Sequence, residues 1–179
     1  MVTPAQVVGY WRDAGPGKWF ERDEAFDGAF RERFETAHFA ASRGEHDAWA
    51  STAEGALALL VLLDQFPRNC FRGSAHSYAT DGLARRYARR AVEAGFDLRV
   101  ESTLRLFFYL PYEHSESLAD QDRSMELFAG IGDAELLRYA KLHRDLIERF
   151  GRFPHRNVAL GRESTREEID YLASGGFSG

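Results

Sequence analysis

At 179 residues and a net charge of −5, the chain has the size of one domain and no overall basic character that would favour binding to nucleic acid. Its 44% hydrophobic and 28% charged residues are typical of a globular protein with a buried core. The single cysteine, Cys70, excludes an internal disulfide and a zinc site built on thiolates. Its apolar neighbour Phe71 indicates a small buried residue rather than a nucleophile.

No segment has the pattern of a signal peptide or a membrane span. The first residues, MVTPAQVVGYWRDAG, lack a basic start followed by an apolar run. The longest apolar stretch, Ala56 to Leu63, is far too short to cross a bilayer. We therefore expect a cytoplasmic protein without a membrane partner.

Helical periodicity dominates the first half of the chain. Phe26, Phe30 and Phe34 are spaced four residues apart, which predicts one buried face of a helix capped by Asp23. Ser51 and Glu54 have the spacing of a capping box before an almost wholly apolar, and so buried, helix. The helices predicted in this half are Thr3–Asp13, the helix from Asp23 to Gly44, Thr52–Phe66 and Ser77–Ala94.

The second half has the same pattern. Asp133 is a predicted cap, and Ser164 with Glu167 is a second predicted capping box. No segment alternates apolar and polar residues as a strand would. The predicted helices are Glu101–Leu110, Ser117–Phe128, Asp133–Phe150 and a last helix from Ser164 to about Ala173. Together these patterns predict one all-α domain over residues 1–179, of about eight helices, with a flexible tail at 175–179.

Three helix–proline junctions repeat along the chain. Pro67, Pro111 and Pro154 each follow an apolar or aromatic helix end and precede polar residues, at intervals of 44 and 43. This period accommodates two helices and two turns, as in stacked antiparallel helical hairpins. Proline also commonly follows helix ends, so three such junctions can arise without repetition.

Motifs of the common enzyme classes are absent: there is no glycine-rich phosphate loop, no His-Glu-x-x-His helix and no nucleophile elbow. We therefore predict no cofactor. If stacked hairpins bring the junctions to one side, their polar side chains would meet there, and Arg would offer a bidentate fork for carboxylate or phosphate. The predicted ligand-binding residues are Asp64, Arg68, Asn69, Arg105, Tyr109, His114, Arg152, His155, Arg156 and Asn157.

Acid–base chemistry, if the protein is an enzyme, is expected from His114 or His155 with Glu113. Glu113, His114, His143 and His155 are ligand types that bind metals, but their spacing is not diagnostic, and we predict no metal site. The competing interpretation is structural: such residues satisfy the free backbone groups of helix ends and tie loops to them.

Other candidate residues have simpler interpretations. Trp11, Trp19, Phe20 and Trp49 are expected in the core or in hydrophobic staples at helix starts, with an aromatic groove as the alternative. His38, His46 and His76 are expected to be surface or helix-flank residues. The arginines of the fourth predicted helix, at 85, 86, 89 and 90, indicate a solvated face rather than a nucleic-acid surface.

The chain resembles the bacterial domain-of-unknown-function 924 family over nearly its whole length. The matching segments are LLDQFPRNCFRG (62–73), FFYLPYEHSE (107–116) and ERFGRFPHRNVALGRESTREE (148–168), with KWFERDEAFD (18–27). The resemblance implies a fold similar to the tetratricopeptide-like helical superfamily, and no activity. From the Arg, His and Asn residues gathered at the three junctions we predict binding of a small anionic ligand or a peptide carboxylate. The alternative is a tetratricopeptide-like scaffold for protein–protein interaction without catalysis.

Overall fold

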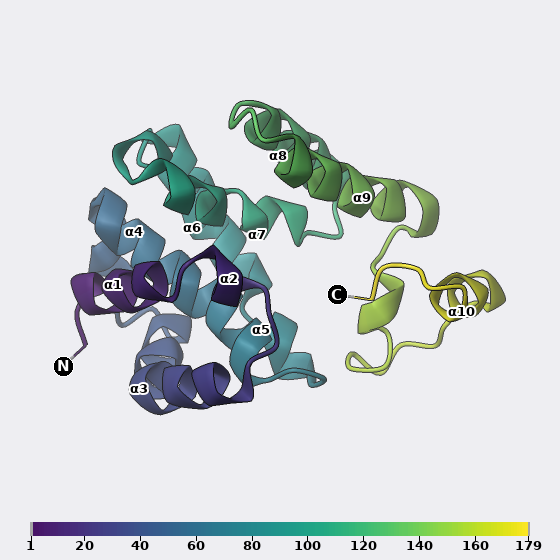
Figure 1. The fold of residues 1–179 in the computed structure, drawn as a ribbon, viewed down its shortest axis with the longest axis horizontal. Coiled ribbons are helices and arrows are strands. Elements are labelled where there is room, and N and C mark those ends of the chain that lie inside the picture. The colour runs from purple at the N-terminus through teal and green to yellow at the C-terminus, as the bar shows by residue number, and fades with distance from the viewer. Residues whose placement is uncertain (1, 179) are drawn as a thin grey trace. The chain divides into compact units, whose positions relative to one another are not determined.

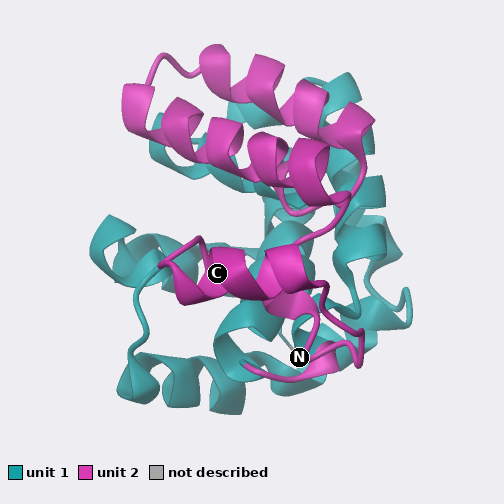
Figure 2. Ribbon diagram, turned by 90° about the vertical axis from the view of Figure 1, so that its right-hand side faces the viewer, with its two compact units in different colours: residues 1–72, 76–111 teal, residues 73–75, 112–179 magenta. Residues whose placement is uncertain are grey.

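The structure, a computed structural model, describes residues 2–178, and among these every regular element is helical. The predicted all-α fold class is confirmed. Contacts divide the chain into two compact units, which are described one at a time (Figure 2). Unit 1 comprises residues 1–72 and 76–111, and unit 2 comprises residues 73–75 and 112–179. None of the helices described is both long enough and apolar enough to span a membrane.

Unit 1 is built around α4, whose residues from Gly55 to Leu60 are all buried. Helices α1 and α6 pack against α4, and α3 packs against α5 (Figure 1). Thr3 forms a capping box with Gln6 at the start of α1, and Asp23 caps α3 as predicted. The α-helices of this unit are α1 (Pro4–Ala14), α2 (Pro16–Trp19), α3 (Glu24–Ser42), α4 (Ala53–Leu60), α5 (Phe66–Cys70) and α6 (Asp81–Glu93).

Aromatic side chains fill the core of unit 1. Phe30 and Phe34 are fully buried, which confirms the predicted stripe on α3. Trp11 stacks on Trp19 with 6.4 Å between ring centroids, and both are buried as expected. Phe20 is instead 58% exposed, so its assignment to the core was wrong.

The central helix does not end at Phe66 as predicted. After α4 the chain makes a π-helical turn, Val61–Gln65, and continues directly into α5. Pro67 in the first turn of α5 has no N–H to donate to the Leu63 carbonyl four residues earlier, and the Thr80 hydroxyl donates to that carbonyl at 2.5 Å instead. The π turn adds a residue to the helix, and the buried polar pair Asp64 and Gln65 lies within it.

Two other predicted boundaries differ in the structure. Residues 102–108 form a 3₁₀ helix, Ser102–Phe108, rather than an α-helix. The cap of α4 is Thr52, whose side chain accepts a hydrogen bond from the Gly55 N–H, instead of Ser51. Both differences arise because a local sequence pattern is compatible with more than one helix type or cap position, and packing selects among them.

Gly55 is required by close packing at the start of α4. A Cβ atom there would clash with the backbone carbonyl of Trp49, which has little freedom to move. We expect Gly55→Ala to lower the free energy of unfolding by about 2 kcal/mol through overpacking. Gly82 in α6, where a Cβ meets nothing within 4 Å, is the control. Gly82→Ala should stabilise by up to about 1 kcal/mol in the same urea titration, and a neutral Gly55→Ala would contradict the packing argument.

Unit 2 contains a helical hairpin and a smaller helix. Helices α8 (Leu118–Ala129) and α9 (Ala134–Phe150) pack side by side, and α10 (Arg166–Ala173) follows a short 3₁₀ helix, Pro154–Arg156 (Figure 1). Helix α7 (Leu110–Glu113) spans the boundary between the two units. Asp133 caps α9 as predicted, and Gly151 ends it with a φ of 70°. The capping box of α10 is Thr165 with Glu168, one residue after the predicted pair.

The predicted flexible tail at 175–179 includes a residue that is packed. Phe177 lies against the apolar cluster of Leu146, Ile147 and Phe153, and its N–H donates to the Tyr171 hydroxyl at 2.8 Å. Gly179 lies outside the described residues. The tail is therefore held by contacts as far as Phe177.

The three prolines open short helical segments. Pro67 and Pro154 lie in the first turn of α5 and of the 3₁₀ helix Pro154–Arg156, and Pro111 is the second residue of α7. Pro67 thus lies within a continuous helical run, whereas Pro154 follows the helix end that Gly151 closes. Pro67 and Pro111 belong to unit 1 and Pro154 belongs to unit 2. A regular repeat of helical hairpins stays a prediction.

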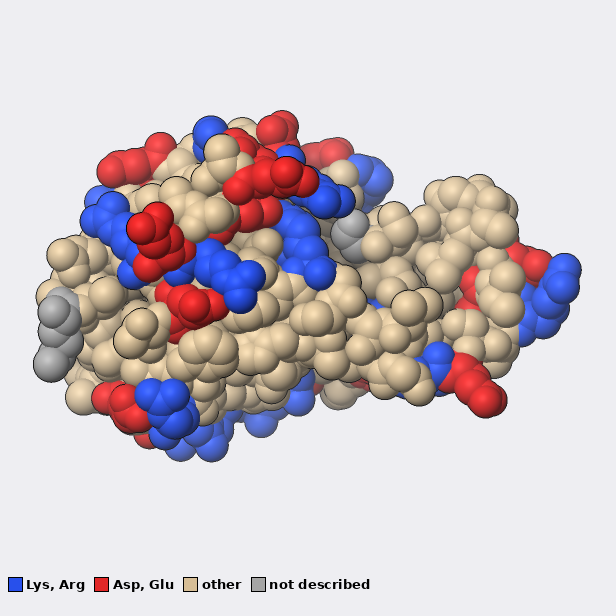
Figure 3. Space-filling model, turned by 90° about the horizontal axis from the view of Figure 1, so that it is seen from below, with Lys and Arg blue, Asp and Glu red and all other residues tan. Residues whose placement is uncertain are grey.

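Acidic and basic side chains are interspersed on the face that Figure 3 shows. Exposed arginines commonly pair with a carboxylate one helical turn away, as Arg31 does with Glu35 at 2.8 Å and Arg138 with Glu135 at 2.7 Å. Such pairs are worth little individually, but they keep the surface charge mixed.

Candidate functional site

The first junction forms an ionic cluster inside unit 1. The carboxylate of Asp64 is 1% exposed and lies 3.2 Å from Nη1 of Arg68. Arg68 also binds Asp81 through two parallel hydrogen bonds of 2.9 Å and donates to the Asp64 backbone carbonyl. Burial by itself would lower the pKa of Arg68, but the two carboxylates outweigh it and raise that pKa. Arg68 is therefore fixed as a cation between two acidic side chains.

Asn69 at the same junction is also tied to its own unit. Its amide donates to Oδ1 of Asp27 at 2.8 Å, and Arg72 donates to the other oxygen of that carboxylate at 3.2 Å. The Cys70 thiol lies between them, 3.7 Å from the Asp27 carbonyl. Burial raises the pKa of Cys70 to about 12, so this cysteine is not a reactive thiolate near neutral pH.

The other predicted residues of unit 1 are Arg105 and Tyr109. The Tyr109 hydroxyl donates to Oδ2 of Asp97 at 2.6 Å, and both side chains are buried. Arg105 is half-buried in the 3₁₀ helix Ser102–Phe108, and its Nε is buried without a hydrogen-bond partner among residues 2–178. The Tyr109 hydroxyl is thus used in a buried hydrogen bond to Asp97, a partner that the sequence did not indicate.

Unit 2 brings together the histidines of the second and third junctions. His143 is buried on α9, with its ring 6.3 Å from His114 and 5.5 Å from Phe153. Phe177 lies 4.7 Å from the His143 ring and 5.4 Å from the His155 ring. We call His114, His143, His155, Arg156 and the two phenylalanines the histidine cluster. His143 and His155 thus share one aromatic environment, and His114 lies beside His143.

The protonation of His143 is determined by its surroundings. Burial lowers its pKa to about 3, and the nearby cationic groups His114, Arg156 and His155 add to this effect. Nδ1 lies 2.9 Å from the Tyr139 carbonyl, which can only accept a hydrogen bond, so Nδ1 carries the proton. Nε2 of the neutral ring is consequently a hydrogen-bond acceptor. Glu113, the predicted acid–base partner of His114 or His155, lies 3.5 Å from Nδ1 of His143.

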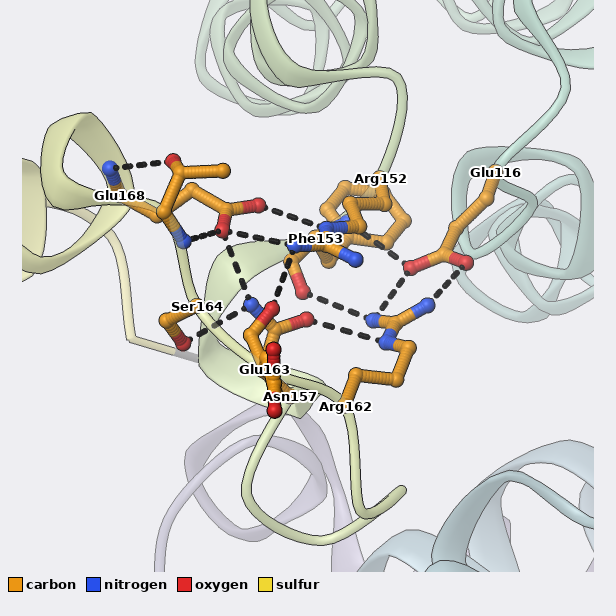
Figure 4. Close-up of polar contacts among 9 residues, drawn as sticks. Glu116, Arg152, Phe153, Asn157, Arg162, Glu163, Ser164 and Glu168 are labelled. Atoms are coloured by element: carbon orange, nitrogen blue, oxygen red, sulfur yellow. Dashed lines mark hydrogen bonds and ion pairs between the residues drawn. The ribbon is translucent and has the colours of Figure 1, made fainter.

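Arg152 and Asn157 form a network that ties the third junction to α10 (Figure 4). Arg152 donates to both oxygens of Glu168, at 2.6 and 2.8 Å, and Asn157 donates to Glu168 and to Ser164. Glu168 is only 2% exposed, and the hydrogen bonds from Arg152 lower its pKa to about 2. For these two residues the geometry matches the structural interpretation, in which polar side chains tie loops to helix ends.

A second ion pair completes this network. Arg162 donates to the two oxygens of Glu116 at 2.8 and 3.0 Å, and Glu116 accepts the backbone N–H of Phe153 (Figure 4). Burial would raise the pKa of Glu116, but the hydrogen bonds from Arg162 and Phe153 hold it below its usual value. The network fixes the loop that carries His155 and Arg156.

The predicted residues therefore fall into two groups. Asp64, Arg68, Asn69, Arg105 and Tyr109 belong to unit 1. Glu113, His114, Arg152, His155, Arg156 and Asn157 belong to unit 2. Within unit 2, His114 of the second junction lies 6.3 Å from His143, which in turn lies 5.5 Å from Phe153 of the third junction. A single pocket shared by all three junctions stays a prediction.

No metal centre is formed by the residues that the structure describes: nowhere in 2–178 do three or more His, Cys, Asp or Glu side chains gather in a metal-binding arrangement. Glu113 and the three imidazoles thus share a neighbourhood without forming a coordination shell.

His38 is not the surface or helix-flank residue that the sequence predicted. This residue is fully buried, and Nδ1 lies 2.8 Å from the Leu62 carbonyl while Nε2 lies 2.9 Å from Nε2 of His76. Burial lowers the pKa of His38, which favours the neutral ring. Because Nδ1 donates to the Leu62 carbonyl, Nε2 is the acceptor, and Nε2 of His76 donates the hydrogen bond to it. Its place on the buried side of α3, four residues after Phe34, is the signal that could have revealed it.

Comparison with known proteins places these features in a family. The pattern of a family described as "Bacterial protein of unknown function (DUF924)" matches residues 7–176. The chain belongs to the DUF924 family. A solved structure of a protein of unknown function from Agrobacterium tumefaciens is 54% identical, with a TM-score of 0.94, and the match covers 96% of this chain and 97% of that one. No curated protein matches the chain. Membership of DUF924 confirms the resemblance seen in the sequence and assigns no activity.

Proposed function

We propose that this protein binds a small oxyanion, a carboxylate or a phosphate, at the histidine cluster of unit 2. The observation that supports the proposal is the convergence of His143, His155 and the Arg156 guanidinium beside Phe153 and Phe177, with the His114 ring 6.3 Å from that of His143. Arg156 lies over the Phe153 ring at 4.4 Å, which restrains its planar group. A restrained guanidinium beside imidazoles is a typical receptor for an anion.

The neutral state of His143 narrows the class of ligand. Because Nδ1–H is used by the Tyr139 carbonyl, the ring contributes an acceptor at Nε2 and no positive charge. An acceptor suits a ligand that has a hydroxyl group as well as an anionic oxygen, such as hydrogen phosphate or a hydroxycarboxylate. Catalysis by His114 or His155 would be an extension of this binding role, with Glu113 beside His143 as a further acid–base group.

Arg152 and Asn157 have a supporting part in this proposal. Their hydrogen bonds to Glu168 fix the loop from which His155 and Arg156 project. We therefore assign ligand contact to His114, His155 and Arg156, and positioning to Arg152 and Asn157.

Titration with inorganic phosphate tests the proposal. Binding is measured from the ring signals of the histidines in NMR spectra. We expect phosphate to shift the signals of the cluster, and Arg156→Gln to weaken binding at least about tenfold, equivalent to ~1.4 kcal/mol. Arg156→Lys keeps the charge and should bind more tightly than Arg156→Gln. His46→Gln, which changes a histidine stacked on Trp49 in unit 1, is the matched control.

Two results would reject the proposal. One is the absence of any phosphate-dependent shift at the cluster histidines. The other is equal affinity in the wild type, Arg156→Gln and His46→Gln, which would show that phosphate binds elsewhere.

A further inference from the structure

A groove in unit 1 lies apart from every residue predicted to bind a ligand. It has a volume of about 390 Å³ and runs between α1 and α3. Its lining includes Gln6, Gly9, Tyr10 and Asp13 from α1, with Phe26 and Arg33 from α3. This volume lies within the range of small-molecule sites, roughly 300–1,000 Å³.

The face of α1 that lines the groove is set by helical spacing. Gln6 is three or four positions before Gly9 and Tyr10, and Asp13 is three or four positions after them, so the four residues lie on one side of the helix along about 10 Å of its length. Tyr10 lies in the middle and stacks on Phe26 and Phe30 with centroid distances of 5.4 and 5.5 Å. The groove therefore has a rigid aromatic wall.

Gly9 keeps the groove open. It lies in the interior of α1, where glycine is less favourable than alanine by about 1 kcal/mol. A Cβ at this position would meet no atom within 4 Å, so no packing contact demands the glycine. Gly82 in α6 is equally open but does not line this groove, so it provides a matched control. A side chain at residue 9 would instead project into the groove.

The groove carries one charge of each sign. Among residues 2–178, neither Asp13 nor Arg33 takes part in an ion pair, whereas Arg12 next to Asp13 pairs with Glu101 at 2.8 Å. The Arg33 guanidinium lies over the Tyr10 ring at 5.4 Å. Asp13 lies in the last turn of α1, where the helix dipole disfavours an anion and favours a nearby cation.

We propose that this groove binds a small zwitterion with an apolar body, of the α-amino-acid class. The ammonium group would pair with Asp13 and the last carbonyls of α1, and the carboxylate with Arg33. The apolar side chain would lie against Tyr10 above Gly9. This site is in a different unit from the histidine cluster and does not depend on the proposed phosphate site.

The test uses L-phenylalanine as the probe and backbone amide shifts of the full chain as the readout. We expect shifts at the α1 and α3 residues of the groove, and Gly9→Leu should reduce the affinity at least tenfold. Gly82→Leu should leave it unchanged. Arg33→Gln and Asp13→Asn should each weaken binding while both variants keep the amide spectrum of the folded protein.

Charge-deleted analogues make the test specific. Phenethylamine lacks the carboxylate, 3-phenylpropionate lacks the ammonium group, and both should bind more weakly than L-phenylalanine. Equal binding of the three probes, unchanged binding in Gly9→Leu, or no shift in the groove with L-phenylalanine would each overturn the proposal. Loss of phosphate binding at the histidine cluster would not affect it.

Discussion

Arg68→Met is expected to lower the free energy of unfolding by about 3 kcal/mol, the largest effect that we predict for a single side chain. Arg68 contacts three acceptor groups in unit 1: the Asp64 carboxylate, the Asp64 backbone carbonyl and the Asp81 carboxylate. Methionine keeps the apolar length of the side chain but removes the cation from a carboxylate that is 1% exposed. A buried carboxylate that loses its counter-ion is strongly destabilising, because Gln65 offers a dipole and not a charge.

Equilibrium urea denaturation of Arg68→Met, Asp64→Asn, the double variant and a control measures this effect. In an Asp64→Asn background the same Arg68→Met change should be less destabilising, since the buried negative charge is already absent. Arg86→Met, on the exposed side of α6, should change stability by less than about 0.5 kcal/mol. Equal losses for Arg68→Met in both backgrounds would show that Asp64 and Arg68 are not coupled.

Glu168→Gln is expected to lower the free energy of unfolding by about 2 kcal/mol. Glu168 accepts from Arg152, Asn157 and the Thr165 N–H, so it joins the third junction to α10 (Figure 4). Glutamine has the same shape but replaces one acceptor oxygen with a donor that faces other donors. Its neighbour Glu167 supplies a matched control, because Glu167 is 62% exposed and pairs with Arg149 at the surface. Glu167→Gln should be nearly neutral.

The contribution of Glu168 should also depend on pH. Its pKa is about 2 in the folded protein and near 4.5 when unfolded, so the folded state binds the proton less readily. The stabilisation is therefore fully present above about pH 4.5 and is lost as the pH falls from 4.5 towards 2. The difference in unfolding free energy between wild type and Glu168→Gln should shrink over this interval. A constant difference down to pH 2 would contradict the assignment.

Local patterns predicted much of the secondary structure. The Phe26, Phe30 and Phe34 stripe, the apolar run of α4, and the caps Asp23 and Asp133 each depend on residues within one or two turns. Such signals are local, so one sequence is enough to read them. The same locality explains the errors: Ser164 and Thr165 are adjacent possible caps, and only the approach of Glu168 to Arg152 selects the second.

The candidate sites were harder to predict because their partners are distant in the chain. Asp81 binds Arg68 across thirteen residues, and Glu116 binds Arg162 across forty-six. No spacing rule joins such residues. The groove between α1 and α3 was missed for the same reason, since its charges, Asp13 and Arg33, belong to different helices.

By itself the sequence determined the all-α class, the positions of the main helices and the DUF924 family, because periodicity, caps and long motifs are properties of the linear chain. Tertiary structure decided which polar groups form hydrogen bonds and ion pairs with one another, and which line the groove between α1 and α3. It joined Arg152 and Asn157 to Glu168, buried His38, and placed His143 and His155 against Phe177. The physical reason is that burial and Coulomb interaction depend on distance in space, which folding sets between residues far apart in sequence.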